Sequence, residues 1–259
     1  MSHSNGEPIR IAMWSGPRNI STAMMRSFSS RPDCAVIDEP FYAAFLAASG
    51  LAHPMRAHIL ASQENDWRKV ADDLTGPAPG GRRVFYQKHM THHMLPEIGR
   101  DWMRHCRHAF LIRHPARVLA SYAAKRDAVT FADIGFAEQW ELFRIAGDLC
   151  GKKPPVVDAD MLLADPRAAL GSLCAALGLA FDERMLSWPP GLRATDGVWA
   201  EHWYDAVAGS TGFEAARLAP VLTEPALQAI EAQALPIYDK LAAHALKGRN
   251  RGRIEPEKG

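Results

Sequence analysis

One stretch decides the fold of this chain: Met13-Trp14-Ser15-Gly16-Pro17-Arg18-Asn19-Ile20-Ser21-Thr22-Ala23-Met24-Met25. A short apolar run from Ile9 to Met13 leads into it and predicts a buried strand. Apolar residues at helical spacing follow, which predicts a helix over about Ser21–Ser30. A turn of small and polar residues between a strand and a helix is suited to an anion, because free backbone N–H groups and the helix dipole point toward it. We therefore expect this turn to hold phosphate.

Length and composition limit the classes of protein to which the chain can belong. Its 259 residues suit one large domain with a sizeable core. The net charge of +1 provides no global field, so we expect neither nucleic acid nor a membrane as a partner. No apolar run approaches the roughly 20 residues of a membrane span, and the N-terminus lacks a signal-peptide pattern. The four scattered cysteines predict reduced thiols in a cytoplasmic protein.

Further apolar runs alternate with helical patterns along the rest of the chain. The runs that predict strands lie at 35–37, 84–86, 108–112 and 155–157. Strands that alternate with helices predict an α/β fold, namely a three-layer sandwich with a central parallel sheet. Residues 43–75 predict two helices or a helical lid. We expect a disordered lead at 1–8, a single α/β domain at 9–246 and a basic mobile tail at 247–259.

Polar residues follow three of these strands, at the edge of the sheet where ligands bind in open α/β folds. Asp38 and Glu39 follow the second strand, Lys88 and His89 follow the third, and Arg113 follows the fourth. Two more histidines, His92 and His93, come soon after His89. Three imidazoles raise the question of a metal, but the HExxH pattern and an accompanying carboxylate are missing. We therefore expect no metal, and we expect His92 and His93 to cap or pack at a helix start.

A nucleotide-binding P-loop is the first candidate for the turn. That motif requires Gly-x4-Gly-Lys-Ser/Thr. Counted from Gly16, the second glycine position holds Ser21 and the lysine position holds Thr22. The fourth strand ends in Arg113 instead of the acidic residue that would hold magnesium. The pattern argues against magnesium-nucleotide catalysis and leaves a kinase-like phosphotransferase as the alternative.

The turn resembles the phosphosulfate loop of another family, the sulfotransferases that use 3′-phosphoadenosine 5′-phosphosulfate (PAPS). That loop reads roughly Pro-Lys-Ser-Gly-Thr-Thr-Trp, and the matching run here is 17–23. Arg18 stands at the lysine of the motif, and Ser21 and Thr22 stand at its hydroxyl pair. The Ser-Gly of the motif is replaced by Asn19-Ile20.

A second motif strengthens the resemblance. The 3′-phosphate motif of the family reads roughly Arg-x-Pro-x5-Ser at a junction between a strand and a helix. Here Arg113, Pro115 and Ser121 match it in identity and spacing. Together the two motifs cover roughly residues 9–125 and identify the chain as similar to a divergent bacterial-type member of this P-loop-like family.

The resemblance implies a donor, a product and a set of binding residues. The donor is PAPS, the product is 3′,5′-adenosine bisphosphate (PAP), and no metal is required. The arginine fork suits the 3′-phosphate because it can donate two parallel hydrogen bonds. The residues expected to bind the donor are Arg18, Asn19, Ile20, Ser21, Thr22, Arg113 and Ser121.

Sulfuryl transfer also needs a general base that takes the proton of the acceptor. The cytosolic enzymes use a histidine near a lysine and shortly before Leu-Pro, and placing Leu95-Pro96 on that pair puts His89 at the catalytic position. Other branches use a glutamate just past the first helix, which is the kind of position that Glu39 holds. We expect His89 first and Glu39 second; if Glu39 is the base, Lys88 or His89 would stabilise the bridging oxygen.

The expected reaction is transfer of a sulfuryl group to a hydroxyl or amine of a small, partly apolar acceptor. The helices at 43–75 and the aromatic segment 188–213 are expected to line the acceptor pocket, although simple packing of the aromatic residues is the more ordinary role. A non-catalytic nucleotide-binding protein is a second alternative. A pyridoxal-phosphate aminotransferase is remote, because Lys88 alone does not make such a site. A homodimer stays open.

Overall fold

A computed structural model describes residues 6–53, 55–124, 128–215 and 220–247. Most of the expected N-terminal lead and all of the basic tail except Lys247 lie outside the described residues. Within these ranges, no helix has both the length and the apolar character that crossing a bilayer requires.

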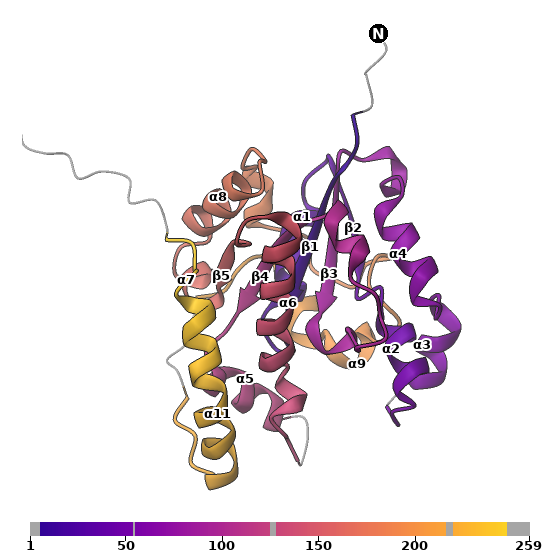
Figure 1. Cartoon of the computed structure of the whole chain (residues 1–259). Helices are drawn as coiled ribbons and strands as arrows, with labels where there is room; N and C mark the ends of the chain where they lie inside the picture. The colour runs from indigo at the N-terminus through magenta and orange to yellow at the C-terminus, as the bar shows by residue number, and fades with distance from the viewer. Residues whose placement is uncertain (1–5, 54, 125–127, 216–219, 248–259) are drawn as a thin grey trace, which may run out of the picture.

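The described residues contain one five-stranded parallel sheet with the order β2-β3-β1-β4-β5 (Figure 1). Its strands are β1 (Ile9–Ser15), β2 (Cys34–Asp38), β3 (Val84–Met90), β4 (Arg107–Ile112) and β5 (Val156–Asp158). Each lies on one of the predicted apolar runs, so the α/β class is confirmed. The central strand β1 pairs with β3 and β4, and the strand order reverses beside it. Ligands in open α/β sheets bind at such a reversal, at the carboxyl ends of the strands.

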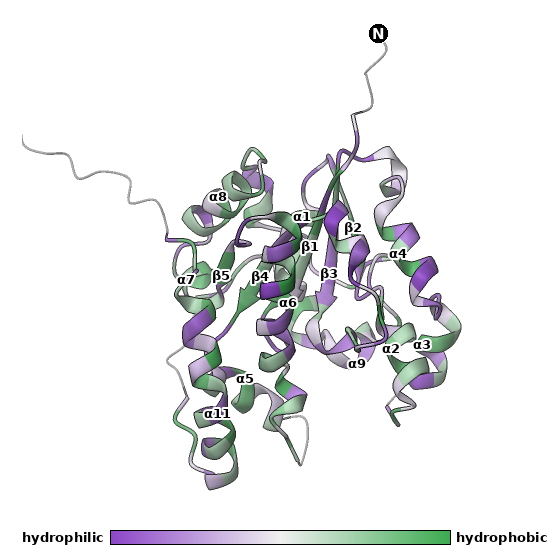
Figure 2. Ribbon diagram, in the orientation of Figure 1, coloured by the Kyte–Doolittle hydropathy of each residue, from purple (hydrophilic) through white to green (hydrophobic). Residues whose placement is uncertain are grey.

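Helices cover both faces of the sheet, which confirms the three-layer sandwich. One core joins Ile11 and Met13 of β1 to α1 (Ser21–Ser29), α7 (Ala159–Ala164) and α8 (Pro166–Ala176). The other joins Ala12 and Trp14 to α2 (Tyr42–Ser49), α4 (Trp67–Thr75), α6 (Phe136–Cys150) and α11 (Pro225–Ala242). Successive strand residues face opposite sides, so β1 serves both cores. Figure 2 shows a hydrophobic β4 between helices of mixed character, whereas the carboxyl end of β3 is hydrophilic.

The remaining elements surround the carboxyl edge of the sheet or connect the layers. Residues 43–75 form most of α2, all of α3 (Arg56–Ser62) and α4. Helix α5 begins at Pro115 and ends at Ala123, while α9 (Ala200–Trp203) and α10 (Asp205–Ala208) come from the aromatic segment. The 3-10 helices in the described ranges are η1 (Pro79–Gly81), η2 (Thr91–His93), η3 (Asp101–His105), η4 (Ala132–Ile134) and η5 (Glu183–Leu186).

Candidate functional site

The backbone of the turn after β1 has a conformation that suits an anion. At Gly16, an added Cβ would lie 2.7 Å from the carbonyl oxygen of Ile134, so a larger residue cannot fit without a shift. Arg18 and Ile20 both adopt left-handed backbone, with φ of 62° and 55°. No side chain caps the start of α1 at Ile20. The first N–H groups of a helix have no partner within it, so those of α1 are available to an anion.

Asn19 holds the turn against the sheet. Its side chain is 1% exposed, and its Nδ2 donates to the backbone oxygen of Leu111 in β4 over 3.2 Å. Ile20 packs on the core that contains α1. Both residues line the cavity that the turn borders, but their side chains are engaged with the protein interior. The polar side chains that this stretch offers to a ligand are therefore those of Arg18, Ser21 and Thr22.

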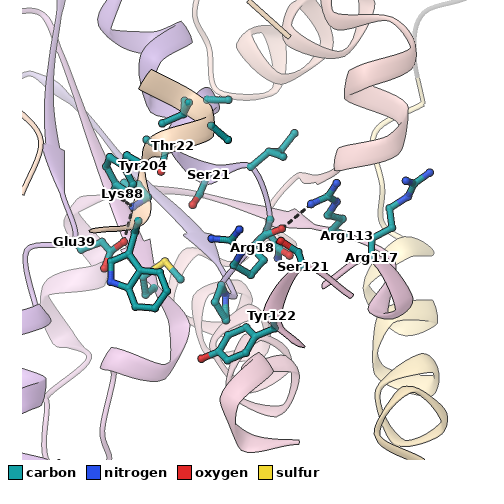
Figure 3. A pocket seen from close by; sticks show the side chains of 18 of the residues that line it. Arg18, Ser21, Thr22, Glu39, Lys88, Arg113, Arg117, Ser121, Tyr122 and Tyr204 are labelled. Atoms are coloured by element: carbon teal, nitrogen blue, oxygen red, sulfur yellow. Dashed lines mark hydrogen bonds and ion pairs between the residues drawn. The ribbon is translucent and has the colours of Figure 1, made fainter. Parts of the chain in front are cut away.

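The second predicted anion site lies directly beside the first (Figure 3). Arg18 Nε donates to Ser121 Oγ of α5 over 2.9 Å, and Arg113 Nη1 donates to the backbone oxygen of Arg18 over 2.9 Å. The Nε of Arg113 is buried and has no hydrogen-bond partner among the described residues. Burial lowers the pKa of both guanidinium groups. A third arginine, Arg117, lines the same cavity and pairs with Asp160 at 2.9 Å.

A buried group of charges lies at the ends of β2 and β3. Asp38 and Lys88 are register partners across the two strands. Lys88 Nζ donates to Asp38 Oδ1 over 2.7 Å, to Glu39 Oε1 over 2.5 Å and to the hydroxyl of Tyr204 over 2.8 Å. An ammonium group has three donors, so all three of Lys88 are in use.

Tyr204 and Trp199 complete this group from a distant part of the chain. The Tyr204 hydroxyl donates to Asp38 Oδ2 over 2.6 Å and accepts from Trp199 Nε1 over 3.2 Å. Both residues line the cavity. The sequence analysis predicts pocket lining or simple packing for the aromatic segment, and it does not predict this contact with Asp38. The closely spaced aromatic residues at 199–204 were the only local signal.

The carboxyl groups of Asp38 and Glu39 share one lysine in this buried cluster. Burial, together with the charge of Asp38, raises the pKa of Glu39, and the favourable contact with Lys88 does not cancel this rise. Burial would lower the pKa of Lys88, but Asp38 and Glu39 outweigh it and hold that pKa well above its usual range. Asp38 and Glu39 as carboxylates with Lys88 as an ammonium carry a net charge of −1. Such a cluster is suited to accept a proton.

Glu39 is held in an unusual backbone conformation. Its φ of 44° lies in the left-handed region, which costs a residue other than glycine on the order of 1–3 kcal/mol. The backbone N–H of Glu39 donates to the carbonyl of Lys88 over 2.9 Å, and Gln63 Nε2 donates to the carbonyl of Glu39 over 3.2 Å. Strained residues that neighbours fix in this way occur often at functional sites.

His89, which was expected first as the general base, is not brought to the cavity with Glu39 and Lys88. Successive residues of a strand face opposite sides of the sheet, so Lys88 and His89 cannot both face the cavity. His89 is 1% exposed and stacks on its register partner Trp14, with ring centroids 4.5 Å apart. Its Nε2 lies 3.2 Å from Gln87 Oε1. Burial lowers the pKa of His89 to about 3, and the residue does not line the cavity.

One cavity of about 950 Å³ joins the two anion sites to the charge cluster. Figure 3 shows Arg18, Arg113, Arg117 and Ser121 on one side, Glu39, Lys88 and Tyr204 on the other, and Ser21 and Thr22 between them. The lining of the cavity also includes several aromatic or imidazole rings, supplied by Tyr42, Phe45, His53, His93, Trp199 and Trp203. The volume suits a ligand larger than phosphate alone.

The three histidines of the segment 89–93 do not lie together. Across the ranges that the structure describes, no three His, Cys, Asp or Glu side chains come together as a group that could hold a metal ion. His92 and His93 belong to η2 and form an edge-on ring contact, whereas His89 stacks on Trp14.

Comparison with known proteins identifies the family. A family model described as a sulfotransferase domain matches residues 9–245. The chain therefore belongs to the sulfotransferase-domain family.

Solved structures share the fold at low sequence identity. The sulfotransferase domain from the Synechococcus PCC 7002 olefin synthase has a TM-score of 0.54 at 18% identity, covering 95% of this chain and 98% of that one. The sulfotransferase from Alicyclobacillus acidocaldarius has a TM-score of 0.56 at 12% identity, covering 93% and 98%.

Two curated proteins of Arabidopsis thaliana are more similar in sequence. Branched-chain-amino-acid aminotransferase-like protein 2 is 37% identical over 90% of this chain, and the like-named protein 1 is 37% identical over 92%. The chain spans only 41% and 42% of their lengths. Most of each relative lies outside the match, so its name carries no argument about the activity of this chain.

Proposed function

We propose that this protein transfers a sulfuryl group from PAPS to a hydroxyl or amine of a small acceptor. The observation that carries the proposal is the single cavity, which has an arginine group at one side and a proton-accepting cluster at the other. The family match supports sulfuryl transfer as the chemistry.

The residues of the cavity fit the donor, which carries two separated anionic groups. Arg18, the hydroxyls of Ser21 and Thr22, and the uncapped N-terminus of α1 suit the 5′-phosphosulfate. Arg113 and Ser121 suit the 3′-phosphate, and the buried Nε of Arg113 has a donor to spare. The hydrogen bond between Arg18 and Ser121 means that the two sets of donors adjoin.

Glu39 and Lys88 have different roles in this proposal. When bound, PAPS supplies the sulfuryl group on a phosphate leaving group. Glu39 takes the proton of the acceptor, which brings the cluster to neutrality. Lys88 holds Glu39 in place, because all three of its donors are used within the cluster. Lys88 can reach a bridging oxygen only by breaking one of these three hydrogen bonds. The bond to the uncharged hydroxyl of Tyr204 is the weakest of them.

Calorimetric titration with PAP and with ATP–Mg²⁺ tests the donor. We expect PAP to bind without a metal and more tightly than ATP–Mg²⁺. Arg18→Ala and Arg113→Ala should each weaken PAP roughly 10- to 100-fold, since each removes a charge-assisted hydrogen bond worth about 1.5–3 kcal/mol. Arg184→Ala, which changes an arginine paired with Asp182 outside the cavity, is the control. Tight binding of ATP–Mg²⁺ in place of PAP would instead support a kinase-like phosphotransferase.

A further inference from the structure

His93 is a buried histidine whose edge faces the proton-accepting cluster. It ends the short helix η2 after β3, is 2% exposed, and lines the cavity. Its Nε2 lies 4.0 Å from Glu39 Oε2. Its Nδ1 is buried and has no hydrogen-bond partner within the described chain. The residue therefore places an underused imidazole next to the general base.

Two aromatic rings of α2 fix the orientation of this imidazole. Tyr42 stacks on it with centroids 4.4 Å apart and an interplanar angle of 23°, and Phe45 stacks on it at 4.9 Å and 22°. Stacked contacts on the ring leave only its edge for polar contacts. The Nε2 edge is the one that lies near Glu39.

We propose that His93 is a second catalytic residue, which donates a hydrogen bond from Nε2 to the acceptor oxygen while Glu39 takes the proton of that oxygen. This inference rests on the proposed function. The gap of 4.0 Å is too long for a direct hydrogen bond. One oxygen atom at about 2.8 Å from both groups closes it, with an angle near 90° at the oxygen.

The proton of His93 is assigned to Nε2 on electrostatic grounds. Burial, with the nearby His92 and Lys88, holds the pKa of His93 well below its usual range, so the ring is neutral and carries one N–H. The negative carboxylate of Glu39 favours that N–H on the nitrogen that faces it. Nε2 is then a donor that points to the place of the acceptor atom.

A donor at this place selects a hydroxyl over an amine. An oxygen has two lone pairs, so one can accept from His93 while the other attacks. An uncharged amine nitrogen has one lone pair, and accepting from His93 would block its attack. In the reaction the acceptor oxygen bonds to sulfur, its proton passes to Glu39, and the bond from sulfur to the phosphate oxygen breaks with its electron pair left on the phosphate. The acceptor class is therefore an uncharged hydroxyl compound, with a flat apolar body that suits the ring-lined walls.

Nitrogen-15 NMR of histidine-labelled protein tests the assignment without any donor. The imidazole signals that vanish in His93→Phe belong to His93. His105→Gln, at the exposed end of η3, is the control for changes in chemical shift that any histidine replacement causes. We expect a neutral ring with the proton on Nε2 at neutral pH. A proton on Nδ1, or on both nitrogens, would overturn the proposal.

Matched acceptor pairs test its consequence. The probes are 7-hydroxy- and 7-amino-4-methylcoumarin, phenol and aniline, and benzyl alcohol and benzylamine, each assayed with PAPS by release of PAP. We expect the unchanged protein to turn over only the hydroxyl member of each pair. His93→Phe should lose roughly 10- to 100-fold in kcat/KM. His93→Gln should recover part of this loss, and His105→Gln should have the rates of the unchanged protein. Amines used as well as hydroxyls, or PAP binding with no hydroxyl turned over, would overturn the inference. Failure to bind PAP would instead count against the proposed function.

Discussion

At the scale of single residues, Glu39 combines burial, a left-handed backbone and a short ion pair with Lys88. His89 is also buried, but it lies against Trp14, lacks the strained backbone and the ion pair, and does not line the cavity. Strand alternation could have excluded the pair Lys88 and His89 from a common site, since the two are consecutive in one strand. The match of Leu95-Pro96 to the family motif favours His89, but Leu95 and Pro96 lie beyond the end of β3. Their spacing from His89 therefore does not determine which face of the sheet His89 occupies.

Glu39→Gln should abolish most of the turnover while PAP binding is retained. Loss of a positioned general base costs typically 10²- to 10⁴-fold in rate, and the glutamine keeps the size of the side chain. The measurements are kcat with PAPS and calorimetric titration with PAP. His89→Gln is the comparison, and we expect it to lower the melting temperature while keeping the rate per folded molecule. Full activity of Glu39→Gln would contradict the assignment of the base.

The pH dependence of kcat/KM should have an acid limb that belongs to Glu39. The carboxylate must be ionised to accept a proton, and its pKa is raised above the ordinary 4.5. Activity should therefore fall as the pH drops through a midpoint above 4.5, and Glu39→Gln should lack this limb. The free energy of unfolding changes with pH in the opposite direction to activity. The folded state binds the proton of Glu39 more tightly than the unfolded state does. The contribution of Glu39 to stability therefore decreases as the pH rises from 4.5 to the raised pKa of the folded state.

Lys88→Met should be strongly destabilising. It leaves the buried carboxylates Asp38 and Glu39 without their shared cation, and removal of one partner of a buried pair costs about 3–5 kcal/mol. Urea denaturation followed by circular dichroism measures the loss. The double variant Asp38→Asn/Lys88→Met should recover part of it, because one uncompensated charge is then removed. Equal stability of Lys88→Met and the unchanged protein would show that the cluster is not charged as described.

At the scale of elements, helix α1 connects the two halves of the site. Its N-terminus forms the anion cradle, and its Arg26 pairs with Asp196 through two hydrogen bonds of 2.6 Å each. Both side chains are buried. Asp196 shortly precedes Trp199 and Tyr204, which reach the cluster at Asp38. Helix α1 therefore follows the turn that we propose for donor binding, and it also fixes the segment that contacts Asp38.

Arg26→Met should loosen this segment without weakening the donor site. We expect faster hydrogen–deuterium exchange over 196–208 and a lower kcat, since Tyr204 would hold Asp38 and Lys88 less firmly. PAP affinity should change little, because Arg26 does not line the cavity. Arg184→Met removes an exposed pair with Asp182, so it should leave both measurements unchanged. Unaltered exchange in Arg26→Met would rule out this coupling.

At the scale of the whole molecule, local patterns predicted the layers and one side of the site. The apolar run of each strand, the turn at Gly16 and the spacing of Arg113 from Ser121 are all local features. Asp38 and Tyr204 could not be paired in this way, because 166 positions separate them along the chain. Their contact depends on the path of the segment after η5, where no periodic pattern predicts an element. Long-range hydrogen bonds between single side chains leave no trace in a local window.

The conformation of Glu39 also has a meaning for the history of such sequences. A glycine or an asparagine adopts left-handed backbone more readily than a glutamate, so replacing Glu39 should relax the main chain while it removes the base. Stability and turnover thus oppose each other at this one position. A lineage that no longer needs the reaction is expected to drift to glycine or asparagine here before it loses the anion cradle. If Glu39 is the base, as we propose, glycine or asparagine at position 39 should mark relatives that bind the donor without catalysing the reaction.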